Sequence, residues 1–460
     1  MLTAVAFILS LALALASWTP VNGQDIVRVE GRRSNLIDVS RLGDGYDLYD
    51  TSHLDVQLLP GGPVWMIEKL RGRSDGLIPF HGKTSDEKIT ADFYKYIAPD
   101  GDQILTGHVH DNKNSVAYDI SRDESGQYVV KTTRPKDVPH PGSPRITKTT
   151  RNSRELEGTS SVDPVPEQDV SAVTIDLMVI WTQNAECELS KLPLGCAVTS
   201  TTENTMIARV DALVAETNQI HVNSNTGVTY SLVHRQRDTS GYNFPENDIN
   251  AALDDLTFNN GTDDGTKLTY VKVLRETHGA DLVHLLIEYP DQSQVPGIAF
   301  MNNNTEAKDQ ELGFGVTRWL DLGNYVFAHE LGHNMGCNHD RGTNVDQGNP
   351  GGCTDPQTNT GYVHPDGDYF TVMAYACRTG LCGYSGTGDC PIIPYFSDGG
   401  TYGGPLNNNV AEIRKNKKVI AAFRKTPGST PAPTAAPSPM PACSSLAAAV
   451  GYYLFSDWFW

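Results

Sequence analysis

The spacing of apolar residues differs between two long regions of the chain. From about residue 24 to 154, short apolar runs such as 64–67 and 116–120 are separated by Gly, Asp and Asn, a pattern typical of β-strands joined by turns. From 173 the runs are longer, and 173–181 is apolar at nearly every position, which predicts a buried strand. We therefore expect a β-rich unit followed by a larger unit of another class.

Helix and strand patterns alternate in the larger unit, which spans 172–425. One stretch repeats its apolar residues on a single helical face, and others alternate as strands do. Such an alternation predicts an α/β fold with a mixed twisted sheet and long helices. The expected elements are helices at 206–220, 268–274 and 410–424 and strands at 228–237, 281–289 and 297–301.

One segment of this unit reads HELGHNMGCNHD from its first histidine, His329. On a helix, His329 and His333 stand one turn apart, so both imidazoles reach one metal ion. Glu330 is offset beside them, where a general base for a bound water is needed. Gly336 then ends the helix and lets the chain bring His339 round as a third ligand. The spacing predicts one catalytic zinc ion, whose fourth position takes a water with a pKa near ~7.

Two other interpretations of the segment remain open at this point. In one, the histidines only cap the helix and form hydrogen bonds. In the other, Cys337 replaces His339 as the third ligand, although Gly336 interrupts the helix first and a thiolate would reduce the Lewis acidity of the metal.

Charge and cysteine content narrow the class of protein. Asp and Glu outnumber Lys and Arg by 55 to 36, which gives a net charge of −19 and argues against nucleic acid or an anionic membrane as a partner. All 8 cysteines lie beyond residue 186, as expected of a secreted domain with disulfide bonds. Cys187 with Cys196 is the expected local pair, and the other pairings stay open. Asn260 and Asn303 begin glycosylation sequons.

The N-terminal segment 1–23 is expected to be a signal peptide. Its apolar run is about 13 residues long, too short to span a bilayer, and small residues follow it. Cleavage after Ala16 and cleavage after Gly23 are both compatible with the sequence. The alternative is a buried helix at the start of the chain. A signal peptide would make the protein secreted and extracellular.

The segment 24–154 is expected to be a propeptide. It lacks cysteine, and Arg151 and Arg154 match the R-x-x-R pattern of subtilisin-like processing proteases. An exposed linker tolerates such a cut, so the sequence predicts a zymogen with a linker at 155–171. The alternative is that these arginines only solvate the linker.

The C-terminal segment 426–460 combines a Pro/Ser/Thr-rich stalk with a hydrophobic tail. It partly resembles a glycolipid-anchor signal, although a polar spacer is absent and Asp457 interrupts the tail. Anchoring at the cell surface and plain secretion both stay open. Outside the two termini, no stretch reaches the ~18 apolar residues of a membrane span.

The histidine motif, together with Met373 and Tyr375 in the sequence TVMAY, resembles the metzincin clan of zinc endopeptidases. The segments 329–340 and 390–398 are most similar to the reprolysin (adamalysin) branch and to the peptidyl-Asp metallopeptidases of microbes. The resemblance covers about 172–425. It implies a catalytic domain divided by a cleft, with an active-site helix above and a Met-turn below, preceded by a β-rich prodomain. More faintly, 107–120 is similar to a reprolysin propeptide hairpin.

The resemblance also implies roles for residues of the motif. The three histidines would bind zinc, Glu330 would activate the water, and Met373 would support the base of the metal site. Asp340 would brace the turn after the third ligand. Tyr375 occupies a place where some metzincins have a fifth ligand or an oxyanion donor, but reprolysins lack that ligand, so a packing role is the alternative.

Substrate-binding residues follow from the same resemblance. An edge strand would pair with an extended protein or peptide substrate, and a later segment would form the wall of the specificity pocket. The residues concerned are Gly297, Ile298, Ala299 and Phe300 in the edge strand and Pro394, Tyr395 and Phe396 in the wall.

The expected function is that of a secreted zinc metalloendopeptidase, and the alternative is a non-catalytic adhesive or binding protein on a metzincin scaffold. The chain departs from the family pattern at Pro296 and in 319–328, where relatives often carry a cysteine. Because 24–154 has no cysteine, a thiolate cannot hold the zymogen latent. A carboxylate or imidazole near His108 to Asp111 is one candidate, and an exposed turn there is the other interpretation. The sequence does not indicate an oligomeric state.

Overall fold

The computed structural model describes residues that form two sheets, seven α-helices and a 3₁₀ turn. The predictions on the signal peptide, on Arg151 and Arg154, on the two sequons and on the C-terminal tail fall outside the described residues. The described residues are 27–28, 53–56, 58, 63–70, 80–134, 138, 144–145, 169–241, 248–257, 268–288, 295–302, 307–318, 320–346, 353, 357–375, 382 and 390–424.

The first sheet is antiparallel throughout and lies in the N-terminal region, which confirms the β-rich unit. Its order is β1-β8-β7-β6-β5-β4-β3-β2. The segment similar to a propeptide hairpin is an antiparallel pair, β6 with β7. The strands are β1 (Val27–Arg28), β2 (His53–Val56), β3 (Trp65–Lys69), β4 (Phe80–Lys83), β5 (Ile89–Ile97), β6 (Gln103–Asp111), β7 (Val116–Arg122) and β8 (Tyr128–Thr133).

The second sheet has the order β10-β9-β11-β13-β12. Only β12 runs antiparallel to its neighbour, so the sheet is mixed, as predicted, and β12 forms one edge. The apolar run 173–181 is the interior strand β9, between β10 and β11, and it is continuous because both of its faces are covered. The strands are β9 (Val173–Trp181), β10 (Val228–Arg237), β11 (Leu282–Leu286), β12 (Gly297–Ala299) and β13 (Phe314–Thr317).

Helices cover both faces of this sheet. Along β9, Leu177 and Val179 belong to a core shared with α4, α7 and α9, whereas Met178 and Ile180 belong to a core shared with α5 and α6. This alternation follows from the two-residue period of a strand. The helices are α3 (Gln183–Leu189), α4 (Ser200–Asn223), α5 (Ile249–Thr257), α6 (Thr269–His278), α7 (Val326–Asn334), α8 (Arg341–Asp346) and α9 (Asn409–Ile420), with a 3₁₀ turn, η2 (Ala307–Leu312).

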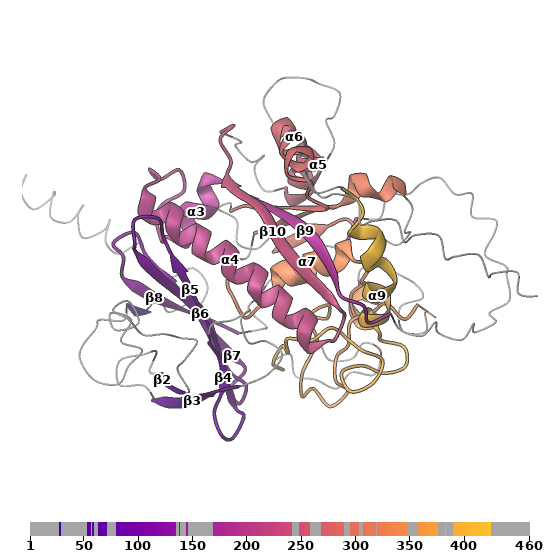
Figure 1. The fold of residues 1–460 in the computed structure, drawn as a ribbon. Coiled ribbons are helices and arrows are strands. Elements are labelled where there is room, and N and C mark those ends of the chain that lie inside the picture. The colour runs from indigo at the N-terminus through magenta and orange to yellow at the C-terminus, as the bar shows by residue number, and fades with distance from the viewer. Residues whose placement is uncertain are drawn as a thin grey trace, which may run out of the picture.

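The long helix α4 lies between the two sheets, in contact with β5 and β6 on one side and β10 on the other (Figure 1). It begins at a capping box in which Thr199 and Thr202 bond each other's backbone. Most of its residues are buried, including polar ones such as Arg209 and Glu216, because other elements cover the helix on more than one side. The N-terminal sheet thus packs directly on the larger unit.

Polar side chains cross the contact between the two units. Arg209 of α4 donates to both oxygens of Asp119 on β7, and Asp119 also accepts from the backbone N–H of Leu322. On β6, His108 and His110 pack against the ring of Tyr325. These two histidines are buried in a strand, so the interpretation of 108–111 as an exposed turn is wrong.

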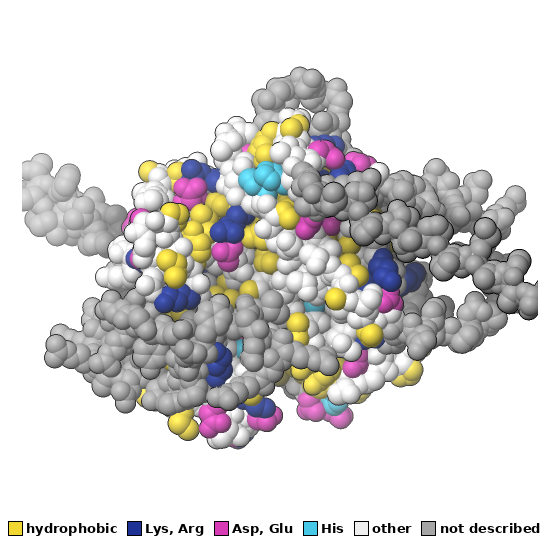
Figure 2. Space-filling model, viewed as in Figure 1, with side chains coloured by type: hydrophobic (Ala, Val, Ile, Leu, Met, Phe, Trp, Pro, Cys, Tyr) yellow, Lys and Arg dark blue, Asp and Glu magenta, His cyan; other side chains and the backbone are white. Residues whose placement is uncertain are grey.

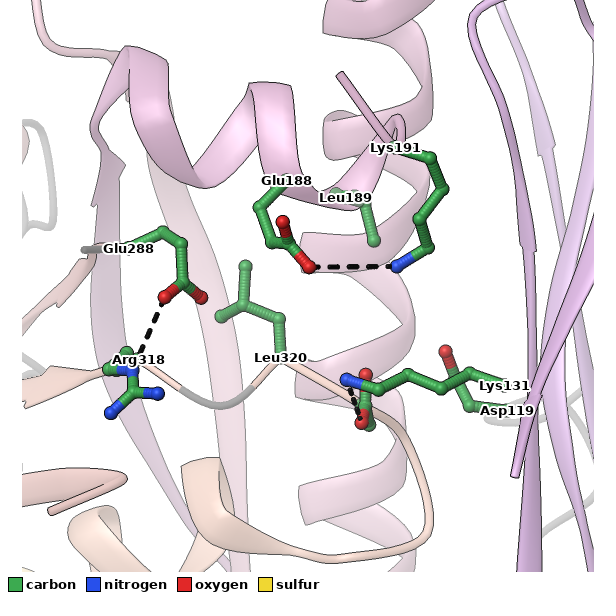
Figure 3. Close-up of a pocket in the computed structure, with 9 residues that line it drawn as sticks. Asp119, Lys131, Glu188, Leu189, Lys191, Glu288, Arg318 and Leu320 are labelled. Atoms are coloured by element: carbon green, nitrogen blue, oxygen red, sulfur yellow. Dashed lines mark hydrogen bonds and ion pairs between the residues drawn. The ribbon is translucent and has the colours of Figure 1, made fainter. Parts of the chain in front are cut away.

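A small polar cavity lies at the same contact (Figure 3). Glu188 faces Lys191 across it, and Arg318 pairs with Glu288 at 3.3 Å. Lys131 of β8 pairs with Asp321 at 2.8 Å, so this ion pair also joins the two units.

Disulfide bonds tie two loops of the larger unit. The expected pair Cys187–Cys196 is confirmed, and Cys353–Cys382 is a second bridge that the sequence did not specify. Cys390 is also disulfide-bonded. Within the described part of the chain, Cys337 is a buried free thiol.

The described helices include none that is long and apolar enough to cross a membrane. On the face of the molecule seen in Figure 2, acidic and basic side chains are interspersed, without a large area of Lys and Arg.

Candidate metal centre and active site

Helix α7 carries the first two histidines of the motif and is buried along its whole length. It contacts β12 and β13 on one side and α4 on another. It begins after Tyr325, which has a left-handed backbone with φ of 56°. At Gly332 the helix lies so close to Met373 that an added Cβ would be 2.4 Å from the Met373 Sδ. The absence of a side chain at Gly332 therefore allows the Met373 loop to approach the helix.

The three histidines converge on one point. The Nε2 atoms of His333 and His329 lie 3.0 and 3.1 Å from the Nε2 atom of His339. Among the described residues, they form the only group of three or more His, Cys, Asp or Glu side chains arranged to hold a metal ion. Three imidazole nitrogens at this spacing fit the short zinc–nitrogen bonds of a catalytic site. The donor set therefore fits zinc.

Backbone carbonyls orient two of the imidazoles. His329 Nδ1 lies 2.8 Å from the Val372 carbonyl oxygen, and His333 Nδ1 lies 2.8 Å from the Cys337 carbonyl oxygen. A carbonyl accepts a hydrogen bond only from a protonated Nδ1, which leaves the lone pair on Nε2 for a metal. These contacts fix the tautomer that metal binding requires.

Burial keeps the imidazoles neutral. It lowers the pKa of His329 to about 4, against a smaller opposing effect from the Val372 carbonyl. It also lowers the pKa of His333 well below its usual value, as do the neighbouring His329 and His339. Neutral imidazole is the form that coordinates a metal.

Glu330 lies beside the histidines with no hydrogen-bond partner on either carboxylate oxygen. It is fully buried, and this burial raises the pKa of its carboxyl well above the usual value. Its side chain rests against Gly297 of β12, where an added Cβ would be 2.4 Å from Oε1. The carboxylate is therefore held between the helix and the edge strand, and its oxygens are left for an outside partner.

The turn after α7 has the predicted geometry. Gly336 has φ of 91°, and an added Cβ would be 2.5 Å from Asn416 Nδ2, so glycine is required for both backbone and space. Cys337 Sγ lies 3.8 Å from the Asn409 carbonyl oxygen and is not part of the histidine cluster. The alternative with Cys337 as third ligand is therefore wrong.

Asp340 holds the loop that follows His339. Its carboxylate accepts from the backbone and the hydroxyl of Thr343 at 3.0 and 2.6 Å, and from the backbone of Tyr375 at 3.2 Å. It therefore connects the turn after the third histidine with the loop that contains Met373.

Tyr375 approaches the metal centre with its hydroxyl. The Oη atom lies 3.2 Å from His339 Nε2, and the two rings are 4.7 Å apart. The side chain is buried, so it packs in the site and also points its hydroxyl toward the point where the imidazoles meet.

The residues expected to bind substrate lie on opposite sides of α7. Gly297, Ile298 and Ala299 form β12, and Phe300 follows directly. The other segment reaches the same helix, because an added Cβ on Gly332 would be 3.1 Å from Phe396. The Tyr395 carbonyl accepts from the Val372 backbone at 3.0 Å, and the Pro394 carbonyl accepts from Asn223 at 3.1 Å.

Three asparagines that the sequence did not single out connect these parts. Asn334 donates to the carbonyls of Phe300 and Phe314, and Asn302 donates to the Asn334 carbonyl. Asn416 of α9 donates to the Met335 carbonyl at 2.9 Å. Asn334 could have been found in the sequence only because it lies inside the histidine motif. No sequence pattern pointed to Asn302 or Asn416.

Comparison with known proteins agrees with this site. A family model for the reprolysin-like metallopeptidases of family M12B matches residues 192–382. Two curated proteins named peptidyl-Asp metalloendopeptidase, from Stenotrophomonas maltophilia (strain K279a) and Xanthomonas campestris pv. campestris, are 32% and 31% identical over 231 and 232 residues. The alignments cover 48% of this chain and 48% and 47% of the relatives, so the chain spans about half the length of the curated relatives it matches.

A solved structure, metalloproteinase-II from Bacteroides fragilis, is also similar. It is 10% identical and covers 66% of this chain and 86% of that chain, with a TM-score of 0.35 that is too low to support an argument about the fold. The sequence match is more informative, because the histidine cluster, Glu330 and Met373 all lie inside the range of the family model. Over residues 192–382, the part that carries the site, the chain is therefore similar to the reprolysin-like metallopeptidases.

Proposed function

We propose that this chain is a secreted zinc-dependent metalloendopeptidase that hydrolyses internal peptide bonds of proteins and is made as a zymogen. One observation carries the proposal. Three imidazole nitrogens converge beside a buried carboxylate that has no partner of its own and that rests against an edge strand. This combination provides the ligands for a metal, a base and a backbone template for a substrate at one place.

The proposed mechanism assigns one task to each group. His329, His333 and His339 would hold zinc, which would supply Lewis acidity toward a bound water. Glu330 takes a proton from that water and returns it to the leaving amine. Tyr375 donates a hydrogen bond to the carbonyl oxygen as it gains negative charge.

The substrate would lie along β12 in an extended conformation. The outer side of this edge strand has backbone N–H and C=O groups with which an extended chain can pair. The segment Pro394 to Phe396 would form the wall of the pocket on the other side of α7. The curated relatives are named for aspartate, so peptides containing Asp belong in the first substrate panel.

The organisation of the chain is part of the proposal. Residues 1–23 would be the signal peptide, 24–154 the propeptide, 155–171 a linker, 172–425 the catalytic domain and 426–460 the stalk and tail. Processing would occur at Arg151 to Arg154. The protein would act outside the cell, either free or held by a glycolipid anchor. Release of cell-bound protein by a phosphatidylinositol phospholipase would indicate the anchor.

Removal of the metal tests the function directly. The full chain, expressed and processed by its host, is expected to contain one zinc ion and to cleave casein. A chelator should abolish cleavage, and one equivalent of zinc should restore it, because the three imidazoles form the only described cluster suited to the ion. Metal content and caseinolysis are measured on the same samples. Continued cleavage after complete zinc removal would contradict the proposal.

Substitution at Gly297 tests the position of the base. In Gly297→Ala the new methyl group would overlap the Glu330 side chain, with Oε1 only 2.4 Å away. Because a shift of about 1 Å in a reacting group costs roughly a hundredfold in rate, we expect kcat to fall by about that factor. The melting temperature is measured on the same samples, so that displacement of Glu330 is distinguished from a general loss of stability.

The matched control is Gly400→Ala, where the nearest atom to the new methyl group is 3.7 Å away. This variant should keep its activity. An unchanged kcat in Gly297→Ala would mean that Glu330 does not act from the observed position.

A further inference from the structure

The edge strand β12 already has a partner in this structure. Arg145 donates its backbone N–H to the Ala299 carbonyl at 3.0 Å and accepts from the Met301 N–H at 3.2 Å. It therefore forms a parallel bridge with Phe300. These two backbone groups of the edge are the ones an extended substrate would use, so Arg145 occupies a substrate position.

The two faces of the edge strand serve different purposes. Gly297 faces Glu330, whereas Ile298 and Phe300 lie in the core beneath α5. Arg145 extends its side chain toward the α5 side, where it forms an ion pair with Asp254. A side chain at this place therefore points away from the catalytic carboxylate, as a recognition group would.

The surroundings of Arg145 suit a guanidinium group. Besides Asp254, it contacts the carbonyl oxygen of Asn250 at 3.5 Å, and its charged carbon lies 5.9 Å from the centre of the Phe300 ring. A carboxylate, a carbonyl acceptor and an aromatic face are the partners that Arg uses together and that Lys uses less well. The side chains of Arg145 and Asp254 are 35% and 28% exposed, so the place is open enough for an incoming residue.

We propose that Asp254, the Asn250 carbonyl and the Phe300 ring form a subsite for an arginine side chain of the substrate, and that Arg145 fills this subsite in the unprocessed chain. The inference rests on the proposed peptidase function and adds a substrate class to it. The segment that contains Arg145 lies before the proposed processing site. The chain therefore carries its own occupant of the edge strand until that segment leaves.

A peptide library tests the subsite in the processed enzyme obtained from the full chain. At one substrate position, Arg should raise kcat/KM about tenfold over Gln, with Lys between them, as expected of a charge-assisted hydrogen bond. Asp254→Asn should reduce this preference to about twofold. The control Asp255→Asn changes the next carboxylate of the same helix and should keep the preference.

Cleavage of casein by the same preparations separates the two hypotheses. If the wild type cleaves casein but shows no basic preference at any position, or if Asp254→Asn keeps the full preference, the subsite is overturned and the peptidase function stands. If casein is not cleaved at all, the peptidase function fails, and the occupancy of the edge is judged by a second measurement.

That measurement is hydrogen exchange in the unprocessed chain. Loss of the ion pair in Arg145→Gln or Asp254→Asn should loosen the bridge and speed exchange of a peptide covering 297–302 by about fivefold. Asp255→Asn should leave the exchange rate unchanged. Equal exchange in all four proteins would show that Arg145 is not held by Asp254, and would overturn the proposal whatever the activity.

Discussion

Glu330→Gln is expected to lower kcat/KM for casein by at least about a thousandfold, because it removes the proposed general base. The change keeps the size of the side chain. It also leaves the three histidines in place, with the carbonyl contacts of His329 and His333 that fix two of their tautomers. Zinc content should therefore remain at one ion per chain. Activity and metal content are measured together, so that loss of the base is distinguished from loss of the metal.

The control for this prediction is Glu276→Gln, which changes a glutamate whose side chain is 61% exposed. It should keep its activity. A Glu330→Gln protein within about tenfold of the wild type would exclude Glu330 as the base, since general bases contribute more than that.

Arg209→Met is expected to destabilise the unprocessed chain by about 3 to 5 kcal/mol, the usual cost of leaving one partner of a buried ion pair alone. The two side chains of the Arg209–Asp119 pair are only 1% and 4% exposed. Burial raises the pKa of Asp119, and Arg209 counteracts this effect. Without the guanidinium, Asp119 would have to be protonated or remain charged in the interior. Urea unfolding of the full chain measures the loss.

Two further variants complete this test. The double variant Arg209→Met with Asp119→Leu should regain much of the stability, because neither member of the pair is then left buried without its partner. Lys83→Met removes one partner of an exposed pair whose glutamate is 68% exposed, and should cost less than about 1 kcal/mol. A loss of the same small size in Arg209→Met would mean that the pair does not hold the N-terminal sheet on α4.

The metal site was predictable from the sequence because it is local. The three histidines of the cluster and Glu330 all lie within residues 329–339, and helix periodicity with one glycine turn determines their arrangement. The contact between Gly297 and Glu330 was not predictable, because it joins segments more than thirty residues apart. The same holds for Asn416, which reaches the turn after α7 from another helix.

How well each helix or strand could be predicted also depended on how much local sequence it offers. The long apolar strands β9 and β10 were predicted with their observed bounds, since their patterns extend over nine and ten residues. The short elements β13 and α5 were missed, with four and nine residues, because patterns of this length are ambiguous. An exposed turn was one interpretation of the segment that contains the histidines of β6, because polar residues usually lie at the surface of a protein. Here they are buried through contacts with Tyr325 and Glu216.

The contacts of the last described helix, α9, affect the order in which the structure forms during synthesis. Asn416 of α9 donates to the Met335 carbonyl at the end of α7. The ammonium of Lys417 donates to the carbonyls of Asp169, Ser171 and Thr226, just before β9 and β10 begin. Because synthesis proceeds from the N-terminus, these bonds form only after every histidine of the site has been translated. A ribosome-bound chain that ends before α9 thus contains all three histidines of the cluster but lacks the contacts made by Asn416 and Lys417. The contacts of α9 with the site would then form late in synthesis, when most of the chain is already clear of the ribosome.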